Sequence, residues 1–71
     1  MRQTLVNRLK VARAEKGLSQ GDLAILVGVT RQTISAIETG RYCPSALLAF
    51  LLAERLEKPV GELFFLKGEV S

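Results

Sequence analysis

The sequence of 71 residues contains no histidine, no tryptophan and only one cysteine, Cys43. Because histidine and cysteine are the usual ligands of zinc and similar metals, we expect no metal site, and no motif indicates a cofactor. Cys43 has no partner for an intramolecular disulfide, which is typical of proteins of the reducing cytoplasm. We expect it to be a small residue of a loop or of the core, with a redox role as the alternative.

The sequence also has no recognisable catalytic motif and no membrane-spanning segment. The chain has no histidine to act as a general base, no evident pair of carboxylates and no glycine-rich phosphate loop. It therefore lacks the residues for acid–base or nucleophilic catalysis, and we do not expect an enzyme. No apolar run reaches the roughly 18 residues of a membrane span, and no stretch resembles a signal peptide. These absences predict a cytoplasmic protein that does not contact membranes.

The charged residues are unevenly distributed along the chain. Seven of the ten basic residues precede Cys43, but only three of the seven acidic residues do. A basic half suits a polyanionic partner such as nucleic acid, although solvated helix faces alone would explain several of these charges. At this length we expect one domain over residues 1–71, whose core gives modest stability unless a second subunit contributes.

The pattern of apolar residues, caps and glycines predicts an all-α fold with five helices. The first is expected from about Leu5 to Lys16, because Leu5, Leu9 and Ala12 have helical spacing and Gly17 follows as a stop. The second helix is expected from Gln20 to Val27, after a variant capping box formed by Ser19 and Asp22. The third is expected from Thr30 to Thr39 and the fourth from Ser45 to Glu57, each with its first residue as the cap. A short fifth helix is expected from Pro59 or Val60 to Phe65.

Residues 19–40 carry the most specific pattern, two short helices joined by a glycine turn. Ala24 is small enough for a close helix crossing, and Gly28 suits a left-handed turn between the helices. Ile34 and Ile37 provide the apolar face that seats the second helix. The remaining face has hydrogen-bonding side chains without a carboxylate, namely Arg31, Gln32, Thr33 and Ser35. Such a face suits contact with the edges of nucleic-acid bases.

The segment 46–53 is apolar at every position, whereas a surface helix has a single apolar stripe. A small monomer has only one core, so Leu47 and Leu51 on the expected outer face need a second covering surface. We therefore predict a homodimer interface with the C-terminal tail 63–71 involved, formed by Leu47, Phe50, Leu51, Phe65 and Leu66. The alternative is that the tail folds back over the 46–57 helix within one chain.

Four motifs occur in order along the chain: RxEKGLSQ at 13–20, LAxLVGVTRQTISxIExGR at 23–41, Pro44-Ser45, and ELF at 62–64. Together, over residues 9–64, they resemble the phage-repressor and Cro-type helix-turn-helix domains, also called the xenobiotic-response-element type. The resemblance implies a compact, lambda-repressor-like fold of five helices. In such proteins the helix after the turn enters the major groove of double-stranded DNA, and the helix before it crosses the backbone.

The resemblance places the DNA contacts near the ends of these two helices. Gln20 would offer its amide and backbone N–H to a phosphate, Gln32 would bind adenine, and Arg31 would bind guanine or a phosphate. The full predicted set is Gln20, Thr30, Arg31, Gln32, Thr33, Ser35, Arg41 and Tyr42, with the last two as backbone anchors. Three alternatives stay open: an idle amide at Gln32, a solvated Ser35, and a Tyr42 that packs against the following helix.

The resemblance also implies a partly buried ion pair between Arg13 and Glu38, which would join the first helix to the end of the third. Burying two charges offsets most of their attraction, so its role would be to orient the helices. The chain departs from the family pattern at Gly21, where a helix former is usual, and at Pro59 and Gly61. It also departs at two ordinarily polar positions of the 46–53 segment, which are leucine here and favour self-association.

Taken together, the sequence predicts a sequence-specific transcription regulator that binds palindromic double-stranded DNA as a homodimer. The alternative is an antitoxin-like interaction protein. In that case the apolar C-terminal half would bind a partner protein, and DNA binding would serve autoregulation.

Overall fold

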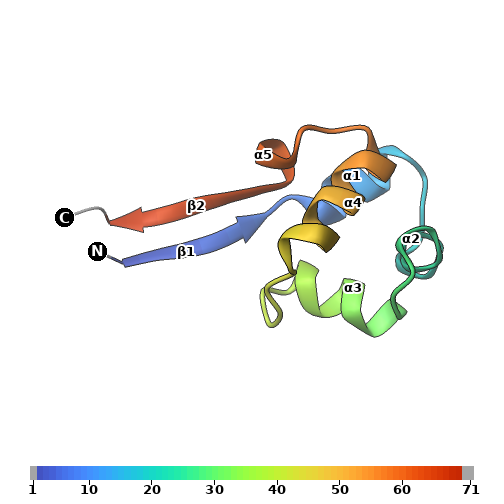
Figure 1. The fold of residues 1–71 in the computed structure, drawn as a ribbon, viewed down its shortest axis with the longest axis horizontal. Coiled ribbons are helices and arrows are strands. Elements are labelled where there is room, and N and C mark those ends of the chain that lie inside the picture. Colours follow the sequence, from blue (N-terminus) through green and yellow to red (C-terminus); the bar gives the residue numbers. More distant parts are fainter. Residues whose placement is uncertain (1, 70–71) are drawn as a thin grey trace.

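The computed structural model describes residues 2–69. Its elements follow one another as β1 (Arg2–Asn7), α1 (Leu9–Glu15), α2 (Gln20–Val27), α3 (Arg31–Glu38), α4 (Ala46–Leu56), α5 (Val60–Leu63) and β2 (Phe64–Glu69). The helices form one body, and the two strands extend from it side by side as an arm (Figure 1). Met1 and the last two residues of the predicted tail, 70 and 71, lie outside the described residues.

The prediction of an all-α fold is wrong at both ends of the chain, where β1 and β2 form an antiparallel sheet. The first helix begins at Leu9, so that Leu5 lies in β1, and the last helix ends at Leu63 and not at Phe65. Leu5 has a spacing that fits a helix, but the β-branched Thr4 and Val6 beside it favour a strand. The pairing joins opposite ends of the chain, so no local pattern announces it.

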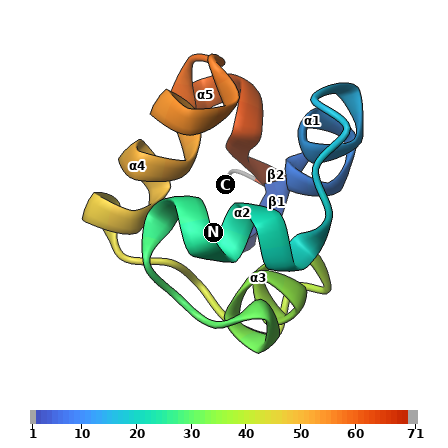
Figure 2. The same ribbon diagram turned by 90° about the vertical axis from the view of Figure 1, so that its right-hand side faces the viewer.

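Seven side chains at the centre of the body are almost completely buried, and every helix contributes at least one of them. They are Leu9, Leu23, Ile34, Ile37, Leu52, Leu56 and Leu63. Figure 2 shows the helices around this common centre, with α2 in front and α3 below it. The core therefore fixes α2 and α3 relative to each other and to the other three helices.

Local signals begin and end the helices largely as the sequence predicts. The capping box of α2 is confirmed, because the Asp22 N–H donates to Ser19 Oγ at 2.9 Å and the Ser19 N–H donates to Asp22 Oδ2 at 3.0 Å. The predicted cap of α4 is confirmed too, since Ser45 Oγ accepts the Leu48 N–H at 3.1 Å. At the other end of α4, Glu57 adopts a left-handed conformation with φ of 56°.

The arm is joined to the body at its base by side-chain and backbone hydrogen bonds. Asn7 Nδ2 donates to the carbonyl oxygen of Ile37 at 2.9 Å, and the Arg8 N–H donates to the carbonyl oxygen of Leu63 at 2.9 Å. Farther out, Leu5 pairs with Leu66 across the sheet, so both leucines lie on the same face of the arm. None of the helices within residues 2–69 has the length and apolar character needed to cross a membrane.

Candidate nucleic-acid interface

The turn between α2 and α3 has the geometry that the sequence predicts. Gly28 has a φ of 76°, and the Val29 N–H donates to the carbonyl oxygen of Ala24 at 3.0 Å. Ala24 is only 2 % exposed, so its small side chain lets the two helices approach closely. Because Ile34 and Ile37 point into the core, the opposite face of α3 is turned outward on the lower side of the body (Figure 1).

The outward face of α3 begins with two exposed side chains, those of Arg31 and Gln32, whereas Thr33 and Ser35 are half-buried. Thr30 caps the helix: its Oγ1 accepts the Thr33 N–H at 3.2 Å and lies 3.0 Å from Thr33 Oγ1. The hydroxyls of Thr30 and Thr33 therefore bond to each other and hold the first turn. They leave Arg31 and Gln32 as the long hydrogen-bonding side chains at the start of α3.

A shallow hollow of about 500 Å³ lies between α3 and the start of α4. Its wall is formed by Val29, Thr30, Gln32, Thr33, Ala36, Tyr42 and Leu48. Tyr42 is 48 % exposed and lines the same hollow as Gln32 and Leu48. It is thus close to both the start of α4 and the outward face of α3.

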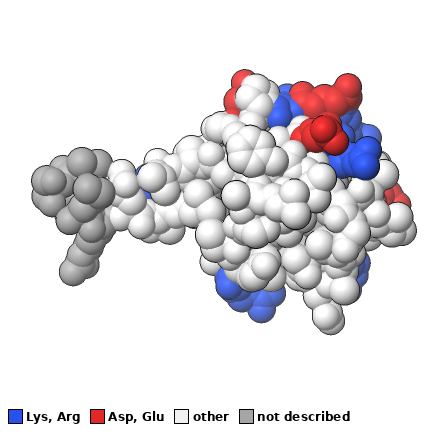
Figure 3. All heavy atoms as spheres, viewed as in Figure 1, with Lys and Arg blue, Asp and Glu red and all other residues white. Residues whose placement is uncertain are grey.

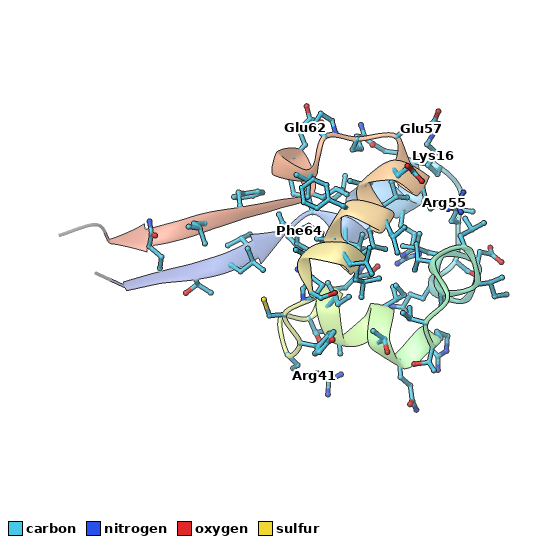
Figure 4. All side chains as sticks on the ribbon, in the orientation of Figure 1. Lys16, Arg41, Arg55, Glu57, Glu62 and Phe64 are labelled. Atoms are coloured by element: carbon cyan, nitrogen blue, oxygen red, sulfur yellow. The ribbon has the colours of Figure 1, made fainter. Side chains whose placement is uncertain are left out.

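Arg41 follows α3 and points away from the body on the same lower side (Figure 4). Its Nε donates to Thr39 Oγ1 at 3.1 Å, which orients the guanidinium. In Figure 3 the patch of basic atoms below the body lies in this region, with no acidic atoms beside it on that face. Cys43 lies in the loop between α3 and α4, one of the two places expected for it, and it is exposed there, with its Sγ 3.8 Å from the carbonyl oxygen of Pro44.

Arg13 and Glu38 form an ion pair that connects α1 to the end of α3. Arg13 Nε lies 2.7 Å from Glu38 Oε2, and the two side chains are 14 % and 5 % exposed. Arg13 Nη2 also donates to Glu38 Oε1 at 3.3 Å, and Nη1 donates to the carbonyl oxygen of Leu18 at 2.9 Å. The hydrogen bond that Arg13 donates to the Glu38 carboxylate raises the pKa of Arg13 above its ordinary value. The single carboxylate of α3 is therefore turned inward and neutralised.

Gln20 makes two contacts that the sequence analysis did not foresee. Its Nε2 donates to Glu38 Oε1 at 3.0 Å, and its Oε1 accepts from Arg31 Nη1 at 3.4 Å. One of the two amide hydrogens expected to face a phosphate is thus bound to Glu38, and the second stays available. A local pattern could not indicate these contacts, because they depend on how α2 packs against both ends of α3.

Charges of both signs gather on the opposite side of the body. There Lys16 pairs with Glu57, and Lys58 Nζ lies 3.1 Å from Glu15 Oε1 (Figures 3 and 4). The hydrogen bond from Lys16 lowers the pKa of Glu57. These pairs join the end of α1 to the end of α4. They lie away from α3, whose one carboxylate, Glu38, is buried against Arg13.

An uncharged surface covers the face of α4 that is turned toward the viewer in Figure 3, except at the C-terminal end of the helix, where charged atoms of both signs lie. On α4, Leu47 is 72 % exposed and Phe50 is 61 % exposed, whereas Leu51 is half-buried. On the arm, Leu66 is 62 % exposed and Phe65 is 38 % exposed. The alternative in which the tail covers this helix is wrong for the described residues, because the tail pairs with β1 instead.

Residues 9–63 match the model of the helix-turn-helix family HTH_3. The chain belongs to this family, the Cro/C1 type of helix-turn-helix proteins. Two relatives are uncharacterized HTH-type transcriptional regulators, YgzD of Bacillus subtilis and MJ0272 of Methanocaldococcus jannaschii. Each is 44 % identical over 63 residues, which cover 89 % of this chain and 96 % of the relative.

Solved structures show the same relationship for this helix-turn-helix chain. The crystal structure of the restriction-modification controller protein C.AhdI from Aeromonas hydrophila superimposes with a TM-score of 0.75 at 38 % identity. The match covers 80 % of this chain and 83 % of that chain. The family is one of DNA-binding transcription regulators, and helix-turn-helix regulators bind double-stranded DNA. The predicted family is confirmed, and the fold is the five-helix body of that family with a small sheet added.

Proposed function

We propose that this helix-turn-helix regulator binds palindromic double-stranded DNA sequence-specifically as a homodimer, with α3 in the major groove. The observation that carries the proposal is the outward face of α3. Arg31 and Gln32 are exposed at its start, and its only carboxylate, Glu38, is buried against Arg13. The guanidinium of Arg31 and the amide of Gln32 can form hydrogen bonds with base edges. Because no carboxylate is exposed on this helix, it would not be repelled by the phosphates on either side of the groove.

The geometry supports different roles for the predicted contact residues. Gln32 is free to make a bidentate contact with N6 and N7 of adenine, which discriminates by about 1–3 kcal/mol. Arg31 is suited to O6 and N7 of guanine. Thr33 and Ser35 are short and half-buried, so a thymine methyl group, a phosphate or a bridging water fits them better. Arg41 lies past the end of α3, where a contact with the phosphate backbone would position the protein without reading sequence.

The uncharged surface of α4 supports the homodimer. A two-fold interface brings a surface against a copy of itself, so any net charge on it would meet the same charge. Leu47 and Phe50 are exposed on α4, and the surface over the N-terminal part of α4 lacks charged atoms in Figure 3. The proposed interface also includes the half-buried Leu51 on the same helix and, on the arm, Phe65 and Leu66. A dimer built this way would present two copies of α3 to successive major grooves, roughly 34 Å apart.

A selection of bound sites from a random pool of double-stranded DNA tests the proposal. We expect two half-sites related by two-fold symmetry, with centres about one helical turn apart. Affinity for the selected site should fall steeply as salt rises, because several phosphates are contacted by each subunit. Gln32→Ala should lose preference at one base pair of each half-site, whereas Lys10→Ala on the exposed side of α1 should not. A pool without enrichment at low salt would overturn the proposal.

The exposed apolar residues also support the alternative function, in which a different protein covers Leu47 and Phe50 as an antitoxin is covered by its toxin. Size-exclusion chromatography with light scattering separates the two proposals. A stable dimer of the isolated chain supports the homodimeric regulator. Aggregation that is relieved by co-expression with a neighbouring gene product supports the interaction protein.

A further inference from the structure

Another hollow, of about 300 Å³, lies between α1, α5 and the start of β2, and we call it the α1–α5 groove. None of the residues predicted to contact DNA lines it. Its volume is at the lower end of the range of small-molecule sites, which are concave and combine apolar walls with a few polar groups. The α1–α5 groove therefore has room for one small ligand.

The apolar part of the wall is open to solvent. Val11 of α1 and Phe65 of β2 line the groove and are 46 % and 38 % exposed. Between them, Gly61 of α5 contributes no side chain, and a Cβ added there would meet nothing within 4 Å. Its backbone is not left-handed, so neither conformation nor close packing requires glycine at this position. The missing side chain leaves the groove open on the α5 side.

Phe65 is on the face of the arm that is turned toward this groove. Successive residues of a strand point to opposite faces, so Phe65 and Leu66 point in opposite directions. Leu66 shares its face with Leu5, which lines a separate small hollow beside the loop after α3. A second copy that lies flat on Leu66 would therefore leave the groove side of Phe65 open. Dimerisation and occupation of the groove would not compete.

Two charged side chains at one end of the groove have no partner among the side chains of residues 3–68. The Arg8 N–H donates to the carbonyl oxygen of Leu63 at 2.9 Å, which places Arg8 beside the preceding residue, Glu62. The Arg8 and Glu62 side chains nevertheless form no ion pair with each other, and Glu62 stands at the outer rim (Figure 4). At the other end of the groove, about 10 Å along α1, Glu15 is already paired with Lys58.

We propose that the α1–α5 groove binds a free α-amino acid with an apolar side chain. The carboxylate of the ligand would accept from the Arg8 guanidinium, and its ammonium group would donate to Glu62. The apolar side chain would cover Val11 and Phe65. A free amino acid carries both charged groups on one carbon, as two unpaired charges at the same end of the groove require. The wall holds two cations and two carboxylates, so a neutral zwitterion suits it better than a multiply charged anion.

Such a ligand would join the arm to the body. Phe65 belongs to β2 and Val11 to α1, so a side chain in contact with both adds a link at the base of the arm. A two-stranded sheet is marginally stable in water, and its opening is the motion that the ligand would oppose. Since Leu66 of the same strand belongs to the proposed dimer interface, the ligand would also favour the dimer. This last step alone rests on the proposed function.

Binding is tested on the free protein, without DNA, by NMR titration of the backbone amide signals with L-phenylalanine and L-leucine. We expect shifts at Val11, Gly61 and Phe65, with a Kd on the order of 1 mM or lower for so small a ligand. N-acetyl-L-phenylalanine lacks the ammonium group and L-phenylalaninamide lacks the carboxylate, so each should bind about tenfold more weakly. No shift in the groove at about 10 mM of either amino acid would overturn the inference. Equal affinity for the free and the blocked forms would overturn it as well.

Two variants assign the charged groups of the ligand to their partners. Arg8→Met removes the guanidinium, and no side-chain cap of α1 is lost with it. This variant should bind L-phenylalanine and its amide with affinities within about twofold of each other. Glu62→Gln should likewise fail to distinguish L-phenylalanine from its N-acetyl form. Lys10→Ala, which removes an exposed cation of α1 outside the groove, should keep both wild-type preferences. Wild-type preferences in Arg8→Met and Glu62→Gln would contradict the proposed site.

Amide hydrogen exchange shows whether the ligand holds the arm. With L-phenylalanine at about ten times its Kd, the amide hydrogens that pair β1 with β2 should exchange about tenfold more slowly, because the ligand binds only the closed arm. The same concentration of N-acetyl-L-phenylalanine should have a smaller effect. Unchanged exchange in the arm with the ligand bound would refute the link between groove and arm. A protein that binds the amino acid but selects no DNA would instead overturn the proposed function and leave this site in place.

Discussion

At the scale of single residues, Asp22 links a helix cap to the pH dependence of stability. Hydrogen bonds from the Ser19 backbone and side chain lower the pKa of Asp22 below its ordinary value. A carboxylate whose pKa is lower in the folded state stabilises the fold fully above its ordinary pKa of about 3.9, and this contribution is lost as the pH falls through the folded value. The urea midpoint of Asp22→Asn should therefore fall less than that of the wild type between neutral pH and about pH 2.

The control for this prediction is Glu54→Gln, which removes an exposed carboxylate from α4. Its urea midpoint should decrease with acid as the wild-type midpoint does. If Asp22→Asn and Glu54→Gln respond to acid in the same way, the capping box does not contribute the expected pH dependence.

The Arg13–Glu38 pair allows a second prediction at the residue scale. Arg13→Ala leaves the Glu38 carboxylate almost completely buried without its cation, and breaking a buried pair costs about 3 kcal/mol or more. We expect the free energy of unfolding, measured by urea denaturation, to decrease by about this amount, together with weaker DNA binding. Lys10→Ala removes an exposed cation from the same helix and should change stability by less than about 0.5 kcal/mol. A wild-type unfolding midpoint in Arg13→Ala would show that the pair is energetically unimportant.

The site shows which residue roles a sequence can indicate. Thr30 and Gly28 were identifiable because a cap and a left-handed turn depend on neighbouring positions. The Arg13–Glu38 pair was expected only from the family resemblance. The Gln20 contacts were not expected at all, because the positions of both Glu38 and Arg31 relative to Gln20 are set by the packing of three helices. Side-chain networks across helices thus needed the three-dimensional arrangement.

At the scale of elements, two glycines of the helix-turn-helix predict opposite effects of the same substitution. Gly28 has a φ of 76°, and a Cβ added there meets nothing within 4 Å, so the cost of Gly28→Ala comes from the backbone alone. We expect a loss of about 1 kcal/mol in urea denaturation. Gly21 lies in the first turn of α2, where an added Cβ would lie 3.7 Å from Ser19 Oγ, an ordinary contact. Gly21→Ala should therefore stabilise the protein by about 0.5 kcal/mol.

These two variants control for each other, because each adds one methyl group to the same helix-turn-helix. Equal effects of the two substitutions would contradict the left-handed geometry of the turn. The departure from the family pattern at Gly21 is, on this reasoning, a small weakness of α2 and has no role in shaping the turn.

The elements that were predicted correctly are those with local signals. The boundaries of α2, α3 and α4 follow from caps and from residues that cannot continue a helix, and they lie within one or two residues of the expected positions. The arm was missed because its strands lie at opposite ends of the chain, so neither has a hairpin turn to announce it. The short apolar segments around Leu5 and Phe65 fit either a helix or a strand until the partner strand is known.

At the scale of the whole molecule, the two main surfaces lie on different elements. The basic, carboxylate-free face belongs to α3 and the loop after it, and the exposed apolar residues Leu47, Phe50, Phe65 and Leu66 belong to α4 and the arm. An isolated two-stranded sheet is at best marginally stable in water, so a second copy that covers Leu66 would stabilise the arm as well as α4. Dimerisation would then hold the two copies of α3 at a fixed distance from each other.

The proposed dimer leads to a prediction for Leu47→Asp. Leu47 is 72 % exposed, so aspartate costs little in the monomer, but in a two-fold dimer it would bring two carboxylates into an apolar contact. We expect light scattering to report a monomer of 7.8 kDa for this variant. Its circular dichroism spectrum should show the same helical content as the wild type. Affinity for the palindromic site should fall by a factor on the order of a hundred, because two half-sites are no longer bound together. Half-site preference should persist, since α3 is untouched.

The matched control is Ile25→Asp on α2, which changes an even more exposed aliphatic residue, 81 % exposed, outside the proposed interface. It should leave the wild-type oligomeric state intact, whatever it does to DNA binding. A Leu47→Asp protein that remains dimeric and keeps full affinity would place the interface elsewhere on the molecule. A monomeric wild-type protein that binds the palindrome tightly would instead mean that DNA, and not the apolar surface of α4, brings the two copies together.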